Sequence, residues 1–345
     1  TRHEQGATHA AQGYARVSGK VGVVTATSGP GATNLVTGIA DAQIDSTPMV
    51  CITGQVASHL LGSDAFQECD IIGISTPVTK WNCQITKASD IPEVIAKAFY
   101  IAKAGRPGPV LIDITKDAQF ELMEFKYKKC HSIRSYTPIP KFSINEINKA
   151  AELINSSKKP FIVWGQGVTL GNAETEFKEF IEKTGIPAAS TILGLSALST
   201  DHPLHVGMLG MHGNYGPNVL TNECDVLIAI GMRFDDRVTG NLETYAKQAK
   251  IIHFEIDPAE VNKNVEVDVP VLGSVKETLP KILELVNKNS HKTWLNKFKS
   301  FYKLEYEKVI KKDIYPTKVG LNMVEVIREI NEVSKGNAII VSDVG

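Results

Sequence analysis

Short runs of apolar, β-branched residues recur along most of this chain and are separated by segments of helix length. In the first third they fall at residues 21–26, 49–53 and 110–114, and an amphipathic stretch at 91–103 precedes the last of them. Strands that are apolar on both faces are typical of parallel sheets buried between helices. The pattern therefore predicts an α/β protein in which parallel sheets are flanked by helices, with right-handed connections.

The same alternation returns in the second half, after an irregular stretch with several lysines and prolines. We expect a helix at 145–156, strands at 160–164, 188–191, 226–231 and 251–256, a lysine-rich amphipathic helix at 293–312, a helix from 317 to about 330, and a strand at 338–341. A chain of 345 residues is too long for one ordinary core. We divide it into a first domain at 1–120, a linker at 121–140, a central domain at 141–290, a linking helix at 291–316 and the beginning of a third domain at 317–345.

The charge and cysteine content exclude some classes of partner. The chain has 37 basic and 38 acidic residues and a net charge of -1, which gives no electrostatic reason to expect nucleic acid or a membrane surface. No apolar run approaches the roughly 20 residues of a membrane span. Five scattered cysteines without a CxxC pair are typical of reduced core thiols. The interpretation is a cytoplasmic protein.

Two motifs near the start carry the chemical signal. RHEQGA at residues 2–7 places an acid at a helix start, and TSGPGATN at 27–34 is a glycine-rich turn that follows an expected strand. Taken singly, the acid would be a helix-capping residue, and such a turn would be only a weak sign of a ligand. The spacing matches neither GxGxxG nor GxxxxGK[ST], so neither a nicotinamide-type Rossmann site nor a P-loop is supported.

Together, these two motifs resemble the pyrimidine-binding domain of thiamin-diphosphate enzymes, specifically the large subunits of acetolactate (acetohydroxyacid) synthases. Further segments share the resemblance: GQV at 54–56, GSDAFQE at 62–68, TKWN at 79–82, GRPGPV at 105–110, GMLGMHG at 207–213 and GMRFDDRVTG at 231–240. The similarity covers essentially the whole chain. It implies the thiamin-diphosphate-enzyme fold, with a partial pyrimidine-binding domain, a complete central FAD-binding domain and the start of a diphosphate-binding domain.

The resemblance implies that Glu4 is the catalytic acid, with Gly29, Pro30 and Asn34 beside the same pyrimidine ring. In this family that carboxyl group bonds a ring nitrogen of thiamin diphosphate and relays a proton. We expect apolar burial to raise its pKa for this task. The implied reaction decarboxylates pyruvate and condenses the product with a second pyruvate or with 2-ketobutyrate. The products are 2-acetolactate or 2-aceto-2-hydroxybutyrate, in the first common step of branched-chain amino-acid biosynthesis.

The implied substrate residues are Phe66, Gln67, Lys80, Met211, Asp236 and Arg237. Arg237 would meet the carboxylate of the second 2-ketoacid, because a guanidinium is a rigid bidentate donor. Asp236 either orients that guanidinium or simply begins a helix, and Lys80 would lie in the substrate channel.

The implied FAD residues are Arg106, Gly165, Gln166, Gly167, His212, Gly213, Gly231, Arg233, Asp235, Glu255, Ile256 and Asp257. The flavin would be structural, because the reaction involves no net redox change. Glycines that follow a strand let dinucleotide phosphates approach the backbone. Glu255 and Asp257 would contact the ribose or adenine, although acids at a loop start are more often simply solvated.

No metal ligand is assigned in this chain. In the family a Gly-Asp-Gly…Asn motif holds Mg2+, and no such motif occurs here, so we expect that site beyond Gly345. Because Thr1 directly precedes the first motif, we expect part of a longer protein, inactive as residues 1–345 alone. The implied assembly is a homodimer or homotetramer with the active site shared between subunits, and a small regulatory subunit is possible.

Several alternatives remain open. Pyruvate oxidase and decarboxylases of the benzoylformate type share the scaffold, but the segment 233–240 and Lys80 favour the synthase. Glyoxylate carboligase is disfavoured because Glu4 is retained. Two alternatives come from other functional classes: a non-catalytic nucleotide-binding module and a nicotinamide-linked oxidoreductase. Ala57 departs from the family, since many relatives have proline there, at the mouth of the channel where herbicidal inhibitors bind.

Overall fold

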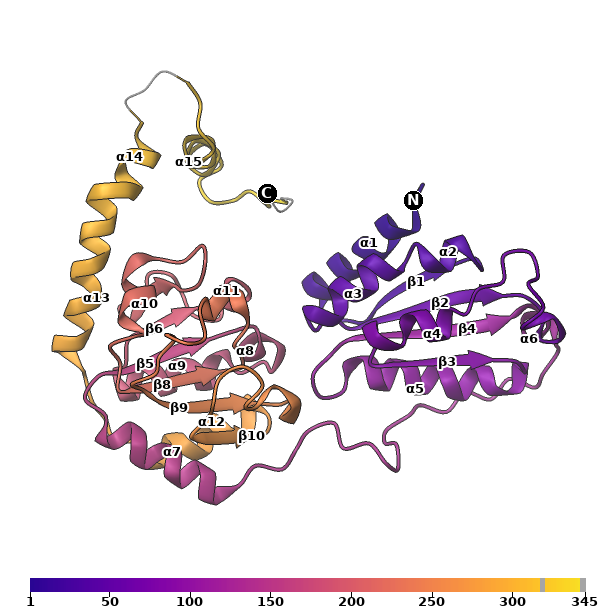
Figure 1. Cartoon of the computed structure of the whole chain (residues 1–345), viewed down its shortest axis with the longest axis horizontal. Helices are drawn as coiled ribbons and strands as arrows, with labels where there is room; N and C mark the ends of the chain where they lie inside the picture. Colours follow the sequence, from indigo (N-terminus) through magenta and orange to yellow (C-terminus); the bar gives the residue numbers. More distant parts are fainter. Residues whose placement is uncertain (317–319, 342–345) are drawn as a thin grey trace. The chain divides into compact units, whose positions relative to one another are not determined.

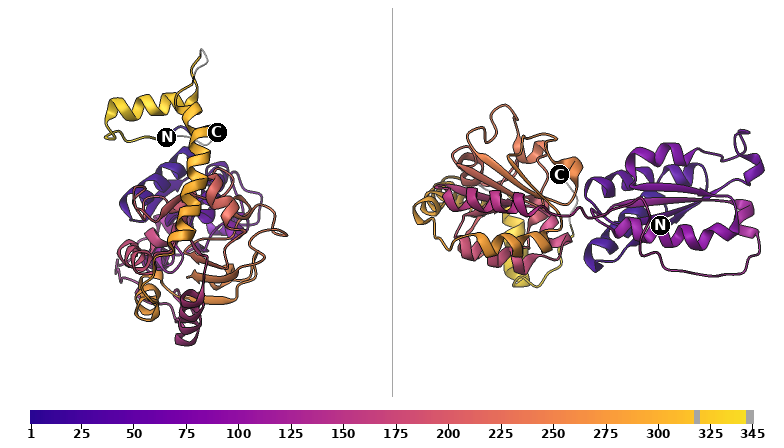
Figure 2. Two further views of the ribbon diagram at one scale, coloured as in Figure 1. Left: turned by 90° about the vertical axis from the view of Figure 1, so that its left-hand side faces the viewer. Right: turned by 90° about the horizontal axis from the view of Figure 1, so that it is seen from below.

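A computed structural model describes residues 1–316 and 320–341. The chain divides into two compact units, Thr1–Ile139 and Pro140–Gly345, and each contains one sheet with helices on both faces (Figures 1 and 2). Every pairing between neighbouring strands is parallel. The predicted α/β fold class is therefore confirmed. None of the helices in the described part of the chain is both long and apolar enough to span a membrane.

The first unit has a four-stranded sheet in the order β1-β2-β4-β3. Its strands are β1 (Gly22–Ala26), β2 (Met49–Gln55), β3 (Trp81–Ile85) and β4 (Pro109–Thr115). The helices α1 (Glu4–Ser18), α3 (Val36–Ile44) and α4 (Ile71–Ser75) pack on one face, and α5 (Ile91–Lys103) packs on the other. The short helices α2 (Pro30–Thr33) and α6 (Lys116–Phe120) follow β1 and β4.

Close packing fixes α1, which begins at Glu4. A Cβ on Gly38 of α3 would lie 2.6 Å from the Cβ of Thr8 in α1, so the two helices touch through small groups. The buried Gln12 side chain donates from Nε2 to the Gly38 carbonyl at 2.8 Å. In the sheet below, all seven residues of the central strand β4 are buried. The start of α1 is therefore held rigidly over the sheet.

The second unit has a six-stranded sheet in the order β10-β9-β8-β5-β6-β7. Its strands are β5 (Pro160–Trp164), β6 (Ala188–Ser190), β7 (His205–Met208), β8 (Val226–Ile230), β9 (Lys250–Glu255) and β10 (Val269–Leu272). One face is covered by α7 (Ile144–Ser156), α9 (Glu174–Thr184) and α12 (Val275–Leu285), and the other by α10 (Tyr215–Leu220) and α13 (Lys292–Glu305). The strand order reverses between β5 and β8. In open α/β sheets such a switch point is where ligands bind, outside the carboxyl ends of the strands.

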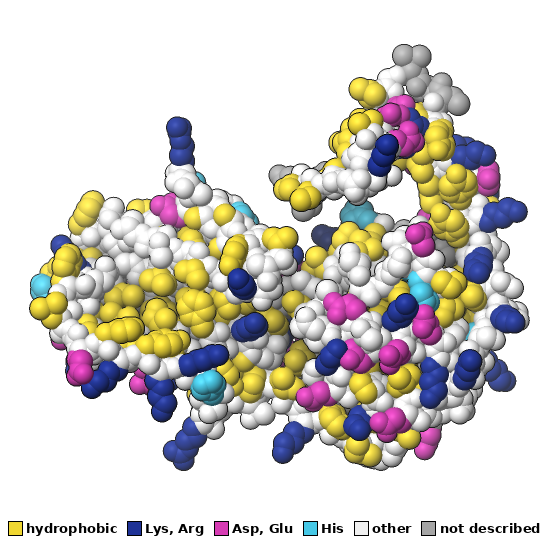
Figure 3. All heavy atoms as spheres, turned by 180° about the vertical axis from the view of Figure 1, so that it is seen from behind, with side chains coloured by type: hydrophobic (Ala, Val, Ile, Leu, Met, Phe, Trp, Pro, Cys, Tyr) yellow, Lys and Arg dark blue, Asp and Glu magenta, His cyan; other side chains and the backbone are white. Residues whose placement is uncertain are grey.

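The predicted linking helix, α13, is packed into the second unit. The Trp294 indole donates to the Pro160 carbonyl at 2.9 Å, and the rings of Phe298 and Phe161 are 5.0 Å apart. A π-helical turn (Tyr306–Ile310), α14 (Lys311–Ile314) and α15 (Met323–Ser334) follow. Basic and acidic side chains are interspersed on the face of this unit shown in Figure 3.

Some expected elements differ from the structure. The strand predicted at 338–341 is wrong, since these residues form neither strand nor helix, and no neighbouring strand among the described residues pairs with them. Conversely, β3, β7 and β10 were not predicted. Residues 317–319, where we expected a helix to begin, and 342–345, which would precede the metal motif, lie outside the described part of the chain.

Candidate active site

The structure brings Glu4 and Asn34 together although 30 positions separate them in the sequence. His3 caps α1 by accepting from the Gln5 amide through Nδ1 at 3.1 Å, which places Glu4 at the first position of the helix. Asn34, which follows α2, donates from Nδ2 to Glu4 Oε2 at 3.0 Å. The half-exposed carboxylate is thus oriented by an amide from the glycine-rich turn.

This contact reverses our expectation for the acid. The hydrogen bond from Asn34 is the main cause that lowers the pKa of Glu4, and the weak desolvation at this position does not offset it. We expected apolar burial to raise that pKa. The expectation is wrong for the structure described here, because the carboxylate has a donor and is not enclosed by apolar side chains.

A second contact joins the turn after β1 to the loop after β2. Gly29 has φ 59° and ψ -121°, and a Cβ there would lie 2.8 Å from the Gln67 carbonyl oxygen and 3.0 Å from its Cα. Gln67 also has a positive φ of 61°. Pro30 occupies the first turn of α2, and Phe66 is 88% exposed. The structure therefore gathers Glu4 and the predicted residues of both loops at the carboxyl edge of the sheet.

Lys80 and Arg106 are not part of this group. Lys80 precedes β3 and Arg106 precedes β4, so both lie at the opposite, amino edge of the parallel sheet. Lys80 Nζ donates to the carbonyls of Ile101 and Ala104 at 2.6 and 2.7 Å, at the end of α5. Arg106 Nε donates to Ser46 Oγ at 2.9 Å. In the first unit these two cations stabilise the chain around the end of α5.

In the second unit, predicted glycines meet at the switch point of the sheet. The Gly167 amide donates to the Gly231 carbonyl at 2.8 Å, and a Cβ on Gly231 would lie 2.7 Å from the Gly167 Cα. Gly231 also has φ +57°. A Cβ on Gly165 would lie 2.6 Å from the Gly231 carbonyl oxygen, and Gln166 lies between these glycines. The close approach of the turns after β5 and β8 therefore requires glycine there.

The acids after β9 lie next to this point. The Gly231 amide donates to the Phe254 carbonyl at 2.9 Å, and Glu255 follows directly. Its Oε1 accepts from the amides of Ile256 and Asp257 at 2.9 and 3.0 Å, so Glu255 shapes its own turn. Sequence reasoning missed His253, which is fully buried; its Nε2 lies 2.9 Å from the Met232 carbonyl oxygen and 3.5 Å from Glu255 Oε2.

The predicted residues after β7 and β8 also meet. The Met211 amide donates to the Arg237 carbonyl at 2.7 Å, and Arg237 Nη1 lies 3.9 Å from Met211 Sδ and 3.6 Å from Asp236 Oδ2. Asp235 caps α11 (Asp236–Thr239) by accepting from the Arg237 amide at 3.0 Å. The side chain of Arg237 remains 68% exposed. This group can present a cation to an external carboxylate.

Three further predicted residues belong to the same loops. Arg233 Nη2 lies 3.7 Å from Asp235 Oδ2. His212 is exposed, and the amide of Gly213 donates to the Gly210 carbonyl at 2.9 Å. The structure gives His212 no partner that would mark it as a base.

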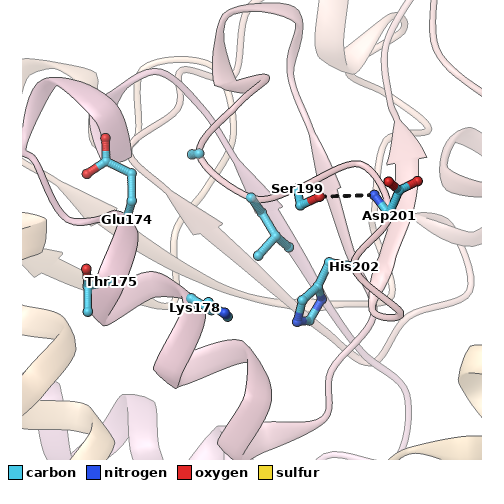
Figure 4. Close-up of a pocket in the computed structure, with 8 residues that line it drawn as sticks. Glu174, Thr175, Lys178, Ser199, Asp201 and His202 are labelled. Atoms are coloured by element: carbon cyan, nitrogen blue, oxygen red, sulfur yellow. Dashed lines mark hydrogen bonds between the residues drawn. The ribbon is translucent and has the colours of Figure 1, made fainter. Parts of the chain in front are cut away.

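A cavity of about 550 Å³ opens beside α9 and is lined by none of the predicted residues. Figure 4 shows one hydrogen bond between residues of its lining. Ser199 Oγ accepts from the Asp201 amide at 3.4 Å, and His202 Nε2 lies 3.5 Å from Glu182 Oε1. We assign this cavity no part in the site. Within residues 1–316 and 320–341, no group of three His, Cys, Asp or Glu side chains is placed to hold a metal ion.

Comparison with known proteins agrees with this geometry. Residues 1–74 match the N-terminal TPP binding domain of thiamine pyrophosphate enzymes, and residues 147–282 match their central domain. The acetolactate synthase large subunit of Corynebacterium glutamicum is 51% identical over 85% of this chain and 47% of its own length. That of Buchnera aphidicola subsp. Schizaphis graminum is 45% identical over the whole chain and 60% of its own length.

An archaeal relative shows the same extent of similarity. The probable acetolactate synthase large subunit of Methanocaldococcus jannaschii is 45% identical over the whole chain and 60% of its own length. The chain thus spans about half to three fifths of the length of these relatives. With two matching domains and these relatives, the chain belongs to the thiamine pyrophosphate enzyme family.

Proposed function

We propose that the protein carrying this chain is the catalytic subunit of an acetolactate synthase. It would decarboxylate pyruvate and condense the product with a second pyruvate or with 2-ketobutyrate. Whole-chain similarity to proteins named acetolactate synthase large subunit supports this assignment. The structural observation that carries it is the Glu4 carboxylate, held by Asn34 at 3.0 Å beside a glycine turn.

The residues around Glu4 fit a ring bound beside the carboxylate. Asn34 bonds Oε2, and a Cβ on Gly31 would lie 3.6 Å from Oε1, so glycine keeps further side-chain atoms away from that second oxygen. Thiamin diphosphate, when bound, supplies the carbon acid and the electron sink of the reaction. Glu4 holds and moves the proton at Oε1, while Asn34 fixes the orientation of the carboxylate.

FAD fits the switch point of the second unit. The strand order of that sheet is the order of dinucleotide-binding folds, and bare glycine turns end both strands that flank the reversal. We propose that 165–167, 231–235 and 255–257 hold the dinucleotide, with His212 and Gly213 near it. Glu255 would set the backbone of its turn, since Oε1 is bonded to two amides of that turn. We propose Arg106 as an FAD contact on the basis of the family resemblance alone. The Mg2+ ligands, in our proposal, lie outside residues 1–345.

For the substrate, we propose that Arg237 binds the carboxylate of the second 2-ketoacid, with Met211 beside it and Asp236 steadying it. We also propose Phe66 and Gln67 of the β2–α4 loop as substrate contacts. Lys80 is left out because its ammonium is bonded to the end of α5. We further propose a cytoplasmic homodimer or homotetramer with the active site shared between subunits, with a small regulatory subunit as an additional partner.

The test uses the complete protein with pyruvate, thiamin diphosphate, Mg2+ and FAD. We expect acetolactate as the product and a flavin absorption band in the purified protein. Glu4→Gln keeps an acceptor for Asn34 but cannot carry the proton, so the rate should fall by at least about 100-fold. Glu93→Gln, at an exposed carboxylate on α5, is the matched control. Acetyl phosphate or free acetaldehyde as the main product would refute the assignment.

A further inference from the structure

A buried polar network lies beneath the loop that follows β2. Asp113 in β4 is 0% exposed and accepts three side-chain hydrogen bonds. Thr53 Oγ1 donates to Oδ1 at 2.7 Å, while Gln55 Nε2 and Gln84 Nε2 donate to Oδ2 at 3.1 and 2.9 Å. Thr53 and Gln84 are the register partners of Asp113 in the neighbouring strands. One carboxylate therefore ties three adjacent strands together near their carboxyl ends.

Gln55 extends this network into the loop at 56–70, which we call the β2 loop. Its Nε2 also donates to the Cys69 carbonyl at 2.8 Å, and its Oε1 accepts from the Val56 amide at 2.9 Å. The side chain is 5% exposed. The first and last parts of the β2 loop are thus bonded to one amide group, and Asp113 fixes the position of that group.

The rest of the β2 loop is braced by further carboxylates. Asp117 accepts from both the amide and the hydroxyl of Ser58. Glu68 accepts from the amides of Gly62 and Ala65 within the loop. The loop bears Phe66 and Gln67, and the Gln67 backbone packs against Gly29. The position of the β2 loop therefore determines whether the Gln67 backbone contacts the Gly29 turn beside Glu4.

We infer that Asp113 is a positioning residue that acts through Gln55 to hold the β2 loop against the Gly29 turn. Nothing in the mechanism uses Asp113 directly, and it does not reach the surface. Fully satisfied polar networks in a core fix one arrangement of the groups they join, and supporting contacts of this kind set the precision of a site. The importance of the loop for catalysis rests on the proposed function, but its dependence on Asp113 does not.

The hydrogen-bond pattern distinguishes two substitutions at this position. In Asp113→Asn, the new NH2 can take the place of Oδ1, because the Thr53 hydroxyl can rotate to accept from it. The remaining oxygen then still accepts from Gln55 and Gln84, so the geometry is retained without the charge. Asp113→Val removes all three acceptor contacts and leaves Gln55 without its anchor in the sheet.

The test measures cleavage by chymotrypsin after Phe66 in the complete native protein, with fragments identified by mass spectrometry. Cleavage of a native loop follows the population of its open form. We expect Asp113→Val to speed it roughly tenfold, which corresponds to about 1.4 kcal/mol, and Asp113→Asn to leave it within about twofold of wild type. Cleavage after the exposed Phe125, in the irregular segment before the second unit, is the internal reference.

Two further variants protect the test against a general loss of folding. Gln55→Met keeps the side-chain length but frees the Cys69 carbonyl, and should match Asp113→Val. Gln84→Ala removes a donor that does not reach the loop, and should remain near wild type. Equal cleavage in wild type, Asp113→Val and Gln55→Met would overturn the inference, as would an Asp113→Asn protein that opens as readily as Asp113→Val.

A kinetic measurement then separates this inference from the proposed function. If the protein makes acetolactate, Asp113→Val should raise KM for pyruvate by roughly tenfold, and Asp113→Asn should restore it. A wild-type protein that makes no acetolactate refutes the proposed function only, because the cleavage result does not depend on activity. Faster loop cleavage in Asp113→Val with an unchanged KM would refute the link from loop position to catalysis.

Discussion

Gly29→Ala tests the contact that joins the two loops of the first unit. The backbone of Gly29, with φ 59° and ψ -121°, is almost matched by Gly240 in the second unit, with φ 58° and ψ -128°. A Cβ on Gly29 would lie 2.8 Å from the Gln67 carbonyl oxygen and 3.0 Å from its Cα, whereas a Cβ on Gly240 would meet nothing within 4 Å. The two positions therefore share the backbone strain and differ in the steric overlap.

The expected magnitudes follow from these two costs. Holding alanine in this region of φ and ψ costs about 1–3 kcal/mol. Gly240→Ala should lower the free energy of unfolding by this strain alone. Gly29→Ala must in addition displace backbone, which is comparable to overpacking a core at about 1–3 kcal/mol. We expect Gly29→Ala to be the more destabilising of the two by about 1–3 kcal/mol, and the β2 loop to move away from the turn.

Peptide-resolved hydrogen exchange is the suitable assay, because it reports the opening free energy of each unit separately. Peptides covering β1 and β2 report on Gly29→Ala, and peptides covering β8 and β9 report on Gly240→Ala. Faster exchange in the β2 loop of Gly29→Ala would show that the added methyl group displaces Gln67. If the two variants lost the same opening free energy, only the shared backbone strain would be at work. That result would refute the close contact between Gly29 and Gln67.

Three other outcomes are expected. Lys80→Met should lower the free energy of unfolding of the first unit by about 1–3 kcal/mol, because two carbonyls at the end of α5 lose their donor; an unchanged urea midpoint would contradict this. Ala57→Pro should stabilise by about 0.4–1 kcal/mol, since φ is already -61°, and should strengthen inhibition by sulfonylurea-type compounds. Equal inhibition constants for the wild type and Ala57→Pro would refute the expected effect on inhibition. Finally, the β2 loop should loosen in acid, because hydrogen bonds hold the pKa values of Glu68 and Asp117 below their usual range. Their contribution is present above the unfolded pKa values, near 4, and is lost as the pH falls through the lower folded values; loop exchange that shows no change below pH 4 would refute this.

Sequence reasoning found the inner strands of both sheets but, among the edge strands, only β1. The central strands β4, β5 and β8 are buried on both faces and read as continuous apolar runs. The missed strands β3, β7 and β10 all lie at sheet edges. An edge strand is only partly buried, so polar residues such as Asn82 and Gln84 interrupt β3, and Pro270 is tolerated in β10. Their pattern therefore lacks the signal that identified the inner strands.

The site shows a similar limit. Motifs identified Glu4, Gly29 and Asn34, but no pattern could show that the Asn34 amide lowers the pKa of Glu4. Lys80 illustrates the same difficulty, because its partners lie 21 and 24 positions later in the chain. Asp113 did leave a signal, since an acid inside an otherwise apolar strand is rarely buried without partners.

Four acids at the carboxyl edge of the first sheet, Glu4, Glu68, Asp113 and Asp117, differ in what their oxygens bind. Asp113, Asp117 and Glu68 accept from two or more protein donors each. Asp117 and Glu68 bond the β2 loop directly, and Asp113 is joined to it through Gln55. Glu4 accepts from one side-chain donor, at Oε2, and a glycine lies beside its other oxygen. A carboxylate that is already bonded at both oxygens is poorly suited to exchange a proton with a ligand, because the exchange would break those bonds. The same edge therefore uses three acids to hold a loop, and this contrast supports our proposal that Glu4 transfers the proton.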